Sequence, residues 1–194
     1  MSLALFPGWR PEAEDQRPLA SLLRSLQSAR PDAAPALQPR RPDQWHATLC
    51  FIGYDQRHRV TPGLLDAFDR VSRRIPPHRF SLERVTYWPQ SGAVVALPRD
   101  CPALQALCDA TRDALRSQGI RPLQVTSQPH LTLAYLGRHY PPQPWLEQVA
   151  CGDTAFQVDR FELLFNPGGR YESLAGWTLR GQALPPRPVQ EALL

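Results

Sequence analysis

The chain has 194 residues, a mass of 21.9 kDa and 42% hydrophobic residues, which is enough for a packed core and excludes a mostly disordered protein. Its formal net charge is +4, and all 22 basic residues are arginine, a residue suited to bidentate contacts with phosphate. A coding bias toward Arg, Pro and Ala would explain the same composition. No stretch approaches the roughly 18 apolar residues of a membrane span, and the N-terminal apolar run is too short for a signal peptide.

The four cysteines are far apart and lack the spacing of a zinc site or of a disulfide framework. They are Cys50, Cys101, Cys108 and Cys151. We therefore expect a reduced, soluble, cytoplasmic protein without a structural zinc ion or disulfide bonds.

The chain opens with a predicted strand over residues 2–7, followed by a helix over 19–29 whose leucines recur on one helical face. Residues 30–44 contain four of the 22 prolines and no periodic apolar pattern, so they are predicted to form a loop. A second helix is predicted over 61–75, with Thr61 as its N-cap.

The later elements repeat this mixture of strands and helices. Two strands are predicted over 80–88 and 93–98, paired around a tight turn. The longest helical pattern covers 101–119 and is ended by a glycine. Two further strands, 156–166 and 171–181, are predicted to pair through the glycine-containing turn between them.

The connections between strands decide the fold class. Successive strands joined by short turns imply antiparallel pairing, so the predicted class is α+β rather than α/β with a parallel sheet. We expect a single domain over residues 1–184 and a loosely held, proline-rich tail over 185–194.

One octapeptide occurs twice in the chain. HATLCFIG stands at residues 46–53 and HLTLAYLG stands 84 positions later, at 130–137. Side chains alternate between the faces of a strand, so His46 and Thr48 share one face, and His130 and Thr132 share the equivalent face of the second copy. Within each copy the imidazole and the hydroxyl are about 6 to 7 Å apart along the strand. One phosphate group can therefore contact both side chains.

Two such pairs suit a displacement reaction at phosphorus. A duplicated unit commonly packs about a pseudo-two-fold axis, which would bring the two His-Thr pairs face to face across a cleft. One neutral imidazole can accept a proton from water while one imidazolium donates a proton to the leaving oxygen on the opposite side. The threonine hydroxyls can bind the non-bridging oxygens, and this chemistry requires no metal ion.

Besides the two His-Thr motifs, the chain contains LALFPGW near its N-terminus and RYESLAGWTL near its C-terminus. In these segments it resembles the bacterial and archaeal RNA 2′,3′-cyclic phosphodiesterases, and the resemblance extends over roughly residues 2–182. These enzymes are members of the two-histidine (2H) phosphoesterase superfamily, also described as LigT-like or 2′-5′ RNA ligase-like. The resemblance implies a bilobal, pseudo-two-fold α+β fold, with an antiparallel sheet in each lobe lining a central cleft and helices outside. It also implies hydrolysis of 2′,3′-cyclic phosphates on RNA ends or nucleotides to 2′-phosphomonoesters, without a cofactor.

The resemblance assigns roles to the repeated residues. His46 matches the proton donor of the family and His130 its proton acceptor, while Thr48 and Thr132 match its phosphate contacts. An isolated strand His is usually structural and Thr is common in strands for its shape alone, but their repetition in matching octapeptides favours function.

Other residues are candidate substrate contacts. The family often has an Arg where this chain has Tyr135, and Arg138, three residues later, is a candidate substitute. Trp45, Trp88 and Tyr171 are aromatic residues able to stack on a base, although aromatic residues near strand ends are more often part of a core or rim.

The remaining histidines, His58, His78 and His139, lie in predicted loops and receive no role. Gln44 and Gln128 share the faces of the motif histidines, where they are either solvated or ligands. Cys50 also follows the face of His46 but lacks a base partner.

Two alternative functions remain open. The first is another activity of the same superfamily, either 2′-5′ RNA ligation or hydrolysis of ADP-ribose cyclic phosphate, with the same residues. The second is a non-catalytic module that binds RNA ends. A metallophosphatase is disfavoured because no DxH, HxH or HExxH pattern occurs. The expected partner is an RNA end or nucleotide carrying a cyclic phosphate, with no membrane and no obligate protein partner, so we expect a monomer.

Overall fold

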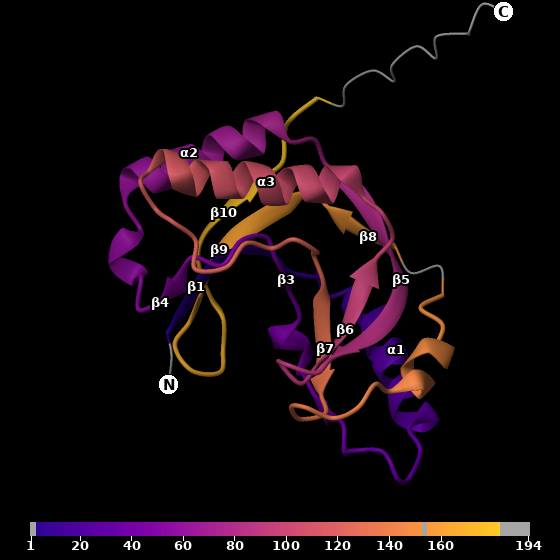
Figure 1. Cartoon of the computed structure of the whole chain (residues 1–194). Helices are drawn as coiled ribbons and strands as arrows, with labels where there is room; N and C mark the ends of the chain where they lie inside the picture. The colour runs from indigo at the N-terminus through magenta and orange to yellow at the C-terminus, as the bar shows by residue number, and fades with distance from the viewer. Residues whose placement is uncertain (1–2, 153–154, 183–194) are drawn as a thin grey trace, which may run out of the picture.

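The protein is described here by a computed structural model that covers residues 3–152 and 155–182, so the predicted tail over 185–194 lies outside the described residues (Figure 1). The strands are β1 (Ala4–Trp9), β2 (Gln38–Pro39), β3 (Ala47–Thr48), β4 (Gly53–Tyr54), β5 (His78–Trp88), β6 (Ala93–Pro98), β7 (Leu131–Tyr135), β8 (Ala155–Val158), β9 (Arg160–Asn166) and β10 (Glu172–Thr178). The helices are α1 (Gln16–Ala29), α2 (Pro62–Arg74) and α3 (Pro102–Ser117), with short 3-10 turns η1 (Pro42–Gln44), η2 (Arg57–Arg59) and η3 (Pro144–Gln148).

The strands form one curled antiparallel sheet, which confirms the α+β class. Its order is β10-β9-β1-β3-β7-β6-β5-β8, with β2 paired to β7 and β4 paired to β1. The strand β3 of the first motif and the strand β7 of the second are therefore neighbours at the centre, and the two halves of the sheet extend from them in opposite directions. The two motifs lie side by side in one sheet, rather than facing each other from two separate sheets.

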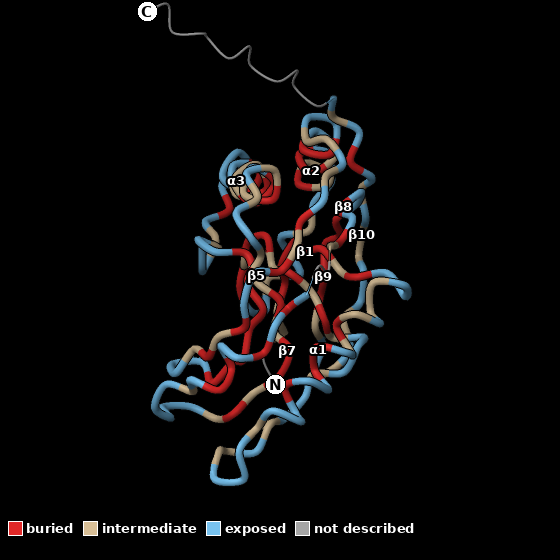
Figure 2. Tube along the Cα trace, turned by 90° about the vertical axis from the view of Figure 1, so that its right-hand side faces the viewer, coloured by how far each residue is buried: buried red, intermediate tan, exposed pale blue. Residues whose placement is uncertain are grey.

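The helices cover one face of this sheet. In α1, the leucines Leu19, Leu22, Leu23 and Leu26 are buried at helical spacing, and each such side chain contributes about 1.5 to 3 kcal/mol of burial free energy. Figures 1 and 2 both place α2 and α3 side by side, and buried residues of all three helices belong to the same core cluster as Ala47 and Leu131 of the central strands. Among the described residues, no α-helix covers the opposite, open face.

Residues of β6 alternate between the two faces. Val94 belongs to the main core, whereas its neighbour Val95 belongs to a smaller apolar cluster against which Trp88 and Tyr135 pack. The period of two expected for a strand thus gives the open face its own apolar floor.

The helix ends agree with the sequence. The hydroxyl of Thr61 accepts a hydrogen bond from the Leu64 N–H at 3.3 Å, as predicted for an N-cap. Gly119 follows α3 with a φ of +68°, a left-handed conformation that favours glycine.

The prediction of one strand over 156–166 was wrong. The segment breaks at Asp159 into β8 and β9. β8 pairs with β5 at one end of the sheet, whereas β9 pairs with β1 and β10 at the other. The apolar alternation shifts phase at the adjacent exposed residues Asp159 and Arg160, so the sequence marks a break, but it does not show that the chain changes pairing partners there.

The first motif is less regular than a continuous strand. The Leu49 N–H donates to the Pro7 carbonyl, and the Ile52 N–H donates to the Leu5 carbonyl. Between these two hydrogen bonds the motif advances by three residues, whereas β1 advances by two. This extra residue is a β-bulge, and it reverses the alternation of faces after Leu49. Cys50, predicted to share the face of His46, is instead fully buried in the core.

Candidate active site

The central pair of strands orients both motifs. β3 and β7 are antiparallel, with Ala47 opposite Leu131. Both side chains point into the core, where they are 2% and 1% exposed. The residues that flank this pair on each strand therefore point to the open face of the sheet.

Four polar side chains gather there. Continuing the antiparallel register by one residue in each direction places His46 opposite Thr132, and Thr48 opposite His130. Residues directly opposite have Cβ atoms about 5 Å apart, and diagonal neighbours are about 7 to 8 Å apart. The two histidines thus occupy diagonal corners of a four-residue group, and the two threonines occupy the other corners.

Each imidazole is held in the same way by the backbone. Nδ1 of His46 lies 2.9 Å from the Gln44 carbonyl oxygen, and Nδ1 of His130 lies 3.0 Å from the Gln128 carbonyl oxygen. A carbonyl can only accept, so each Nδ1 carries the proton and each Nε2 is the nitrogen left for chemistry. His78 makes the same bond to the carbonyl two residues before it, so the bond is a local backbone feature and not a mark of function on its own.

An aromatic ring packs against each histidine. The Tyr171 ring meets His46 edge-on with centroids 4.8 Å apart, and the Phe6 ring lies on His46 at 4.9 Å. The Trp88 ring meets His130 at 4.3 Å. These contacts fix the plane of each imidazole and exclude water from part of it.

Burial makes both imidazoles hard to protonate. It lowers the pKa of His46 to about 4, against the raising effect of the bond to Gln44, and the positive charges of Arg40, His130 and Arg10 act in the same direction as burial. Burial also lowers the pKa of His130 below its ordinary value of 6.5. Both rings are therefore neutral in the free protein at pH 7.

A cleft of about 390 Å³ opens beside this group. Its walls carry Thr48, Thr132 and His130 together with Tyr135. The loop over 124–128 and the half-buried Phe51 and Trp88 complete it. The cleft is large enough for a nucleotide-sized ligand.

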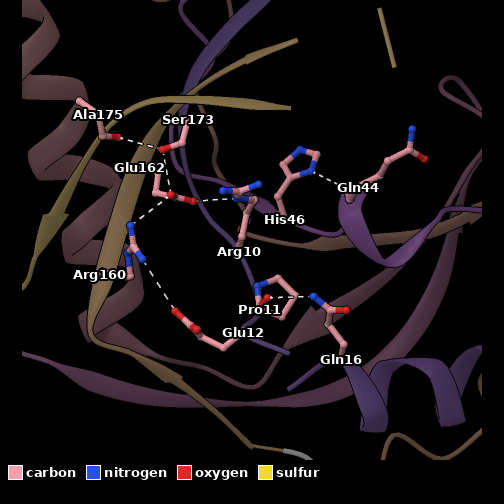
Figure 3. A network of polar contacts seen from close by, with 10 residues as sticks. All are labelled: Arg10, Pro11, Glu12, Gln16, Gln44, His46, Arg160, Glu162, Ser173 and Ala175. Atoms are coloured by element: carbon pink, nitrogen blue, oxygen red, sulfur yellow. Dashed lines mark hydrogen bonds and ion pairs between the residues drawn. The ribbon is translucent and has the colours of Figure 1, made fainter. Parts of the chain in front are cut away.

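A charged network lies on the side of His46 next to β1 (Figure 3). The Arg10 Nε donates to a carboxylate oxygen of Glu162 at 2.7 Å, and the other oxygen accepts from Arg160 Nη2 at 3.2 Å and from Ser173 Oγ at 2.8 Å. Burial would raise the pKa of Glu162, but the hydrogen bonds from Arg10 and Ser173 hold it below the ordinary value. Arg10 is thus already paired with a carboxylate.

The other candidate contacts lie in different places. Tyr135 lines the cleft, and Tyr171 contacts His46. Trp45 is 1% exposed and is part of the core, so it offers no open ring face for stacking on a base. Arg138 is exposed in the turn after β7 and is not among the residues lining the cleft.

Some residues at the site were missed from the sequence. Phe6 was read only as part of an opening strand, and the alternation that places His46 and Thr48 on one face would place Phe51 on the other, which the bulge prevents. Arg40 lies in the proline-rich segment, which gave no signal, yet its guanidinium is close enough to act on His46. Gln44 and Gln128 act through their carbonyl oxygens, which any residue type would supply.

Within residues 3–152 and 155–182, no group of three or more His, Cys, Asp or Glu side chains is arranged to hold a metal ion. None of the helices in the same part of the chain is long and apolar enough to cross a membrane.

Comparisons with known proteins agree with this geometry. The family model described as the 2′-5′ RNA ligase superfamily matches residues 14–170. No curated protein matches the chain. The solved structures that it resembles include E. coli LigT complexed with 3′-AMP, with 21% identity, a TM-score of 0.64, and coverage of 92% of this chain and 98% of that one.

Two further structures extend the likeness. TT0787 of Thermus thermophilus has 23% identity and a TM-score of 0.70, with 93% of this chain and all of that chain covered. The MHV ns2 PDE domain has 13% identity and a TM-score of 0.51, with 89% and 99% covered. At these identities the structures establish a shared fold, and the family model covers most of the chain. The chain therefore belongs to the 2′-5′ RNA ligase superfamily, the two-histidine phosphoesterases.

Proposed function

We propose that the protein is an RNA 2′,3′-cyclic phosphodiesterase that hydrolyses cyclic phosphates on RNA ends or nucleotides to 2′-phosphomonoesters. One observation carries the proposal. Two imidazoles stand at diagonal corners of a four-residue group, each with Nδ1 bound to a carbonyl and Nε2 left for proton transfer. A diagonal separation of about 7 to 8 Å leaves room for one phosphorus centre between them.

The two histidines take opposite roles in this reaction. Nε2 of His130 accepts a proton from water as the water oxygen bonds to phosphorus. The bond from phosphorus to the ribose 3′-oxygen breaks on the opposite side, and Nε2 of His46 donates a proton to that oxygen. The hydroxyls of Thr48 and Thr132 donate hydrogen bonds to the non-bridging oxygens, where negative charge accumulates.

The low pKa of His46 fits a donor that is charged by its substrate. In the free protein, burial and nearby positive charges hold the pKa of His46 at about 4. A bound phosphodiester brings a negative charge next to the ring and raises this pKa. An imidazolium of low intrinsic pKa is a strong acid, which favours proton transfer to the poorly leaving alkoxide.

The comparisons support a nucleotide phosphate as the ligand. E. coli LigT, which shares the fold, has been solved in complex with 3′-AMP and with phosphate. Another activity of the superfamily, such as 2′-5′ RNA ligation or hydrolysis of ADP-ribose cyclic phosphate, would use the same residues. A module that only binds RNA ends would keep the cleft without turnover. Identification of the product separates these possibilities.

The test uses the purified protein with 2′,3′-cyclic mononucleotides and an oligonucleotide ending in a cyclic phosphate. Chromatography should identify the 2′-phosphomonoester as the product. His46→Ala and His130→Ala should each lower the hydrolysis rate by about 10² to 10⁴, and the two losses should not multiply. His58→Ala, on the exposed η2 turn, is the matched control and should retain the rate. Absence of turnover with wild-type protein would refute the proposal.

A substrate with a phenolate leaving group separates the roles of the two histidines. A phenolate departs without a proton, so His46→Ala should recover much of its activity on this substrate. His130→Ala should stay slow because water still needs a base. Recovery by His130→Ala alone would reverse the assignment.

A further inference from the structure

Arg40 is anchored to the strand of the second motif. It directly follows β2, which pairs with β7 so that Gln38 lies opposite Tyr135. The Arg40 backbone N–H donates to the Leu133 carbonyl at 2.8 Å, which continues this pairing by one step. The backbone of Arg40 is therefore fixed beside the strand that carries Thr132.

The side chain of Arg40 reaches across to the first motif. Its guanidinium carbon lies 5.7 Å from the centroid of the Tyr135 ring, within cation–π range. Its Nη2 donates to the Tyr171 hydroxyl at 2.9 Å, and the Tyr171 ring in turn meets His46 edge-on. Two tyrosines thus hold the guanidinium between the second motif and the histidine of the first.

Arg40 lacks the carboxylate that neutralises the neighbouring arginines. Arg10, on the other side of His46, is paired with Glu162 at 2.7 Å. Arg41, the next residue along the chain, is paired with Asp43 at 3.0 Å. Among the described residues, no Asp or Glu forms an ion pair with Arg40, and its buried Nε has no hydrogen-bond partner. An arginine without a counter-ion beside the two histidines is suited to an anion.

We propose that Arg40 is the cationic residue that binds the phosphate of the substrate, in place of an arginine at position 135. The inference rests on the proposed function for its substrate, a phosphodiester anion. The guanidinium of Arg40 then lies on the Tyr135 ring, and the hydrogen bond to Tyr171 orients the guanidinium toward the non-bridging oxygens. Neither Arg40 nor Arg138, the candidate from the sequence, is among the residues that line the cleft, but Arg40 is held beside it by Tyr135 and Tyr171.

The size of the effect follows from the bond that is lost. A hydrogen bond to a charged group contributes enough that its removal weakens binding by about 10- to 100-fold. Arg40→Met should therefore weaken binding of inorganic phosphate and of adenosine 2′-monophosphate by this factor, measured by calorimetry. Arg40→Lys keeps the positive charge but loses the paired N–H donors of the guanidinium, so it should recover only part of the affinity for phosphate.

Two arginine variants serve as comparisons. Arg24→Met, on the exposed side of α1, removes the same charge far from the site and should bind like the wild type. Arg138→Met tests the rival residue and should also bind like the wild type. Circular dichroism and thermal melting establish that each variant is folded. If Arg40→Met does not fold, Tyr171→Phe, which removes only the hydroxyl that accepts from Arg40, should weaken phosphate binding instead.

The outcomes separate this inference from the proposed function. Phosphate binding needs no turnover, so an Arg40-dependent anion site in a protein that hydrolyses no cyclic phosphate would uphold the inference and refute the function. Hydrolysis by Arg40→Met with an unchanged KM would uphold the proposed function and refute the inference. Unchanged phosphate binding in folded Arg40→Met, or a loss of binding in Arg138→Met alone, would overturn the inference.

Discussion

Replacing His46 by Asn should make the protein more resistant to acid. The Asn amide has the length to keep the hydrogen bond to the Gln44 carbonyl, but it cannot bind a proton. In the wild type, burial and neighbouring positive charges lower the pKa of His46 from 6.5 to about 4. Between these two pH values, the unfolded chain therefore binds a proton at His46 and the folded protein does not.

The sign and the size of the effect follow from this difference. Above pH 6.5 neither state binds the proton, and His46 has no pH-dependent effect on stability. As the pH falls toward 4, only the unfolded state gains the proton, so the free energy of unfolding decreases. At about 1.4 kcal/mol for each pH unit, the loss reaches about 3 kcal/mol.

Urea unfolding of the wild type and His46→Asn at several pH values between 7.5 and 4 measures this quantity. The stability of the wild type relative to the variant should decrease by about 3 kcal/mol over that range. His58→Asn, an exposed position, is the control and should follow the wild type. Parallel curves for wild type and His46→Asn, within about 1 kcal/mol, would refute the argument that the folded protein holds His46 as a neutral ring.

Two further predictions concern the reaction. Because burial lowers the pKa of both histidines below 6.5, the dependence of kcat/KM on pH should be a bell with its maximum below pH 6.5, and an optimum at pH 8 would contradict the donor and acceptor pair. Since imidazoles move both protons in the proposed mechanism, the rate should be unchanged in excess chelator, whereas a loss that a divalent ion restores would show that a metal takes part.

Much of the fold could be predicted because the sequence signals are local. The leucines of α1, the N-cap Thr61 and the hairpin of β5 and β6 depend on residues within a few positions of each other. The shared faces of the His-Thr pairs also follow from the period of a strand. The antiparallel class followed from turn lengths.

The errors arose where distant partners decide the structure. The run over 156–166 contains two apolar stretches separated by Asp159 and Arg160 alone, and its two parts pair with strands at opposite ends of the sheet. The bulge in the first motif depends on its register against β1, where Pro7 has no N–H to donate, and this bulge determines that Cys50 is buried. No window of the sequence contains both strands of either pairing.

The same reasoning explains why the histidines could be found from the motif and the cation could not. An imidazole is short and stiff, so its position follows from the strand that carries it, and a repeated strand pattern is enough to locate it. An arginine has a long flexible stem, so a site can take its cation from any backbone within reach. Here the pairing of β2 with β7 brings Arg40 from a proline-rich loop to a place beside Tyr135. The absence of an arginine from a motif is therefore weak evidence that the site lacks a positive charge.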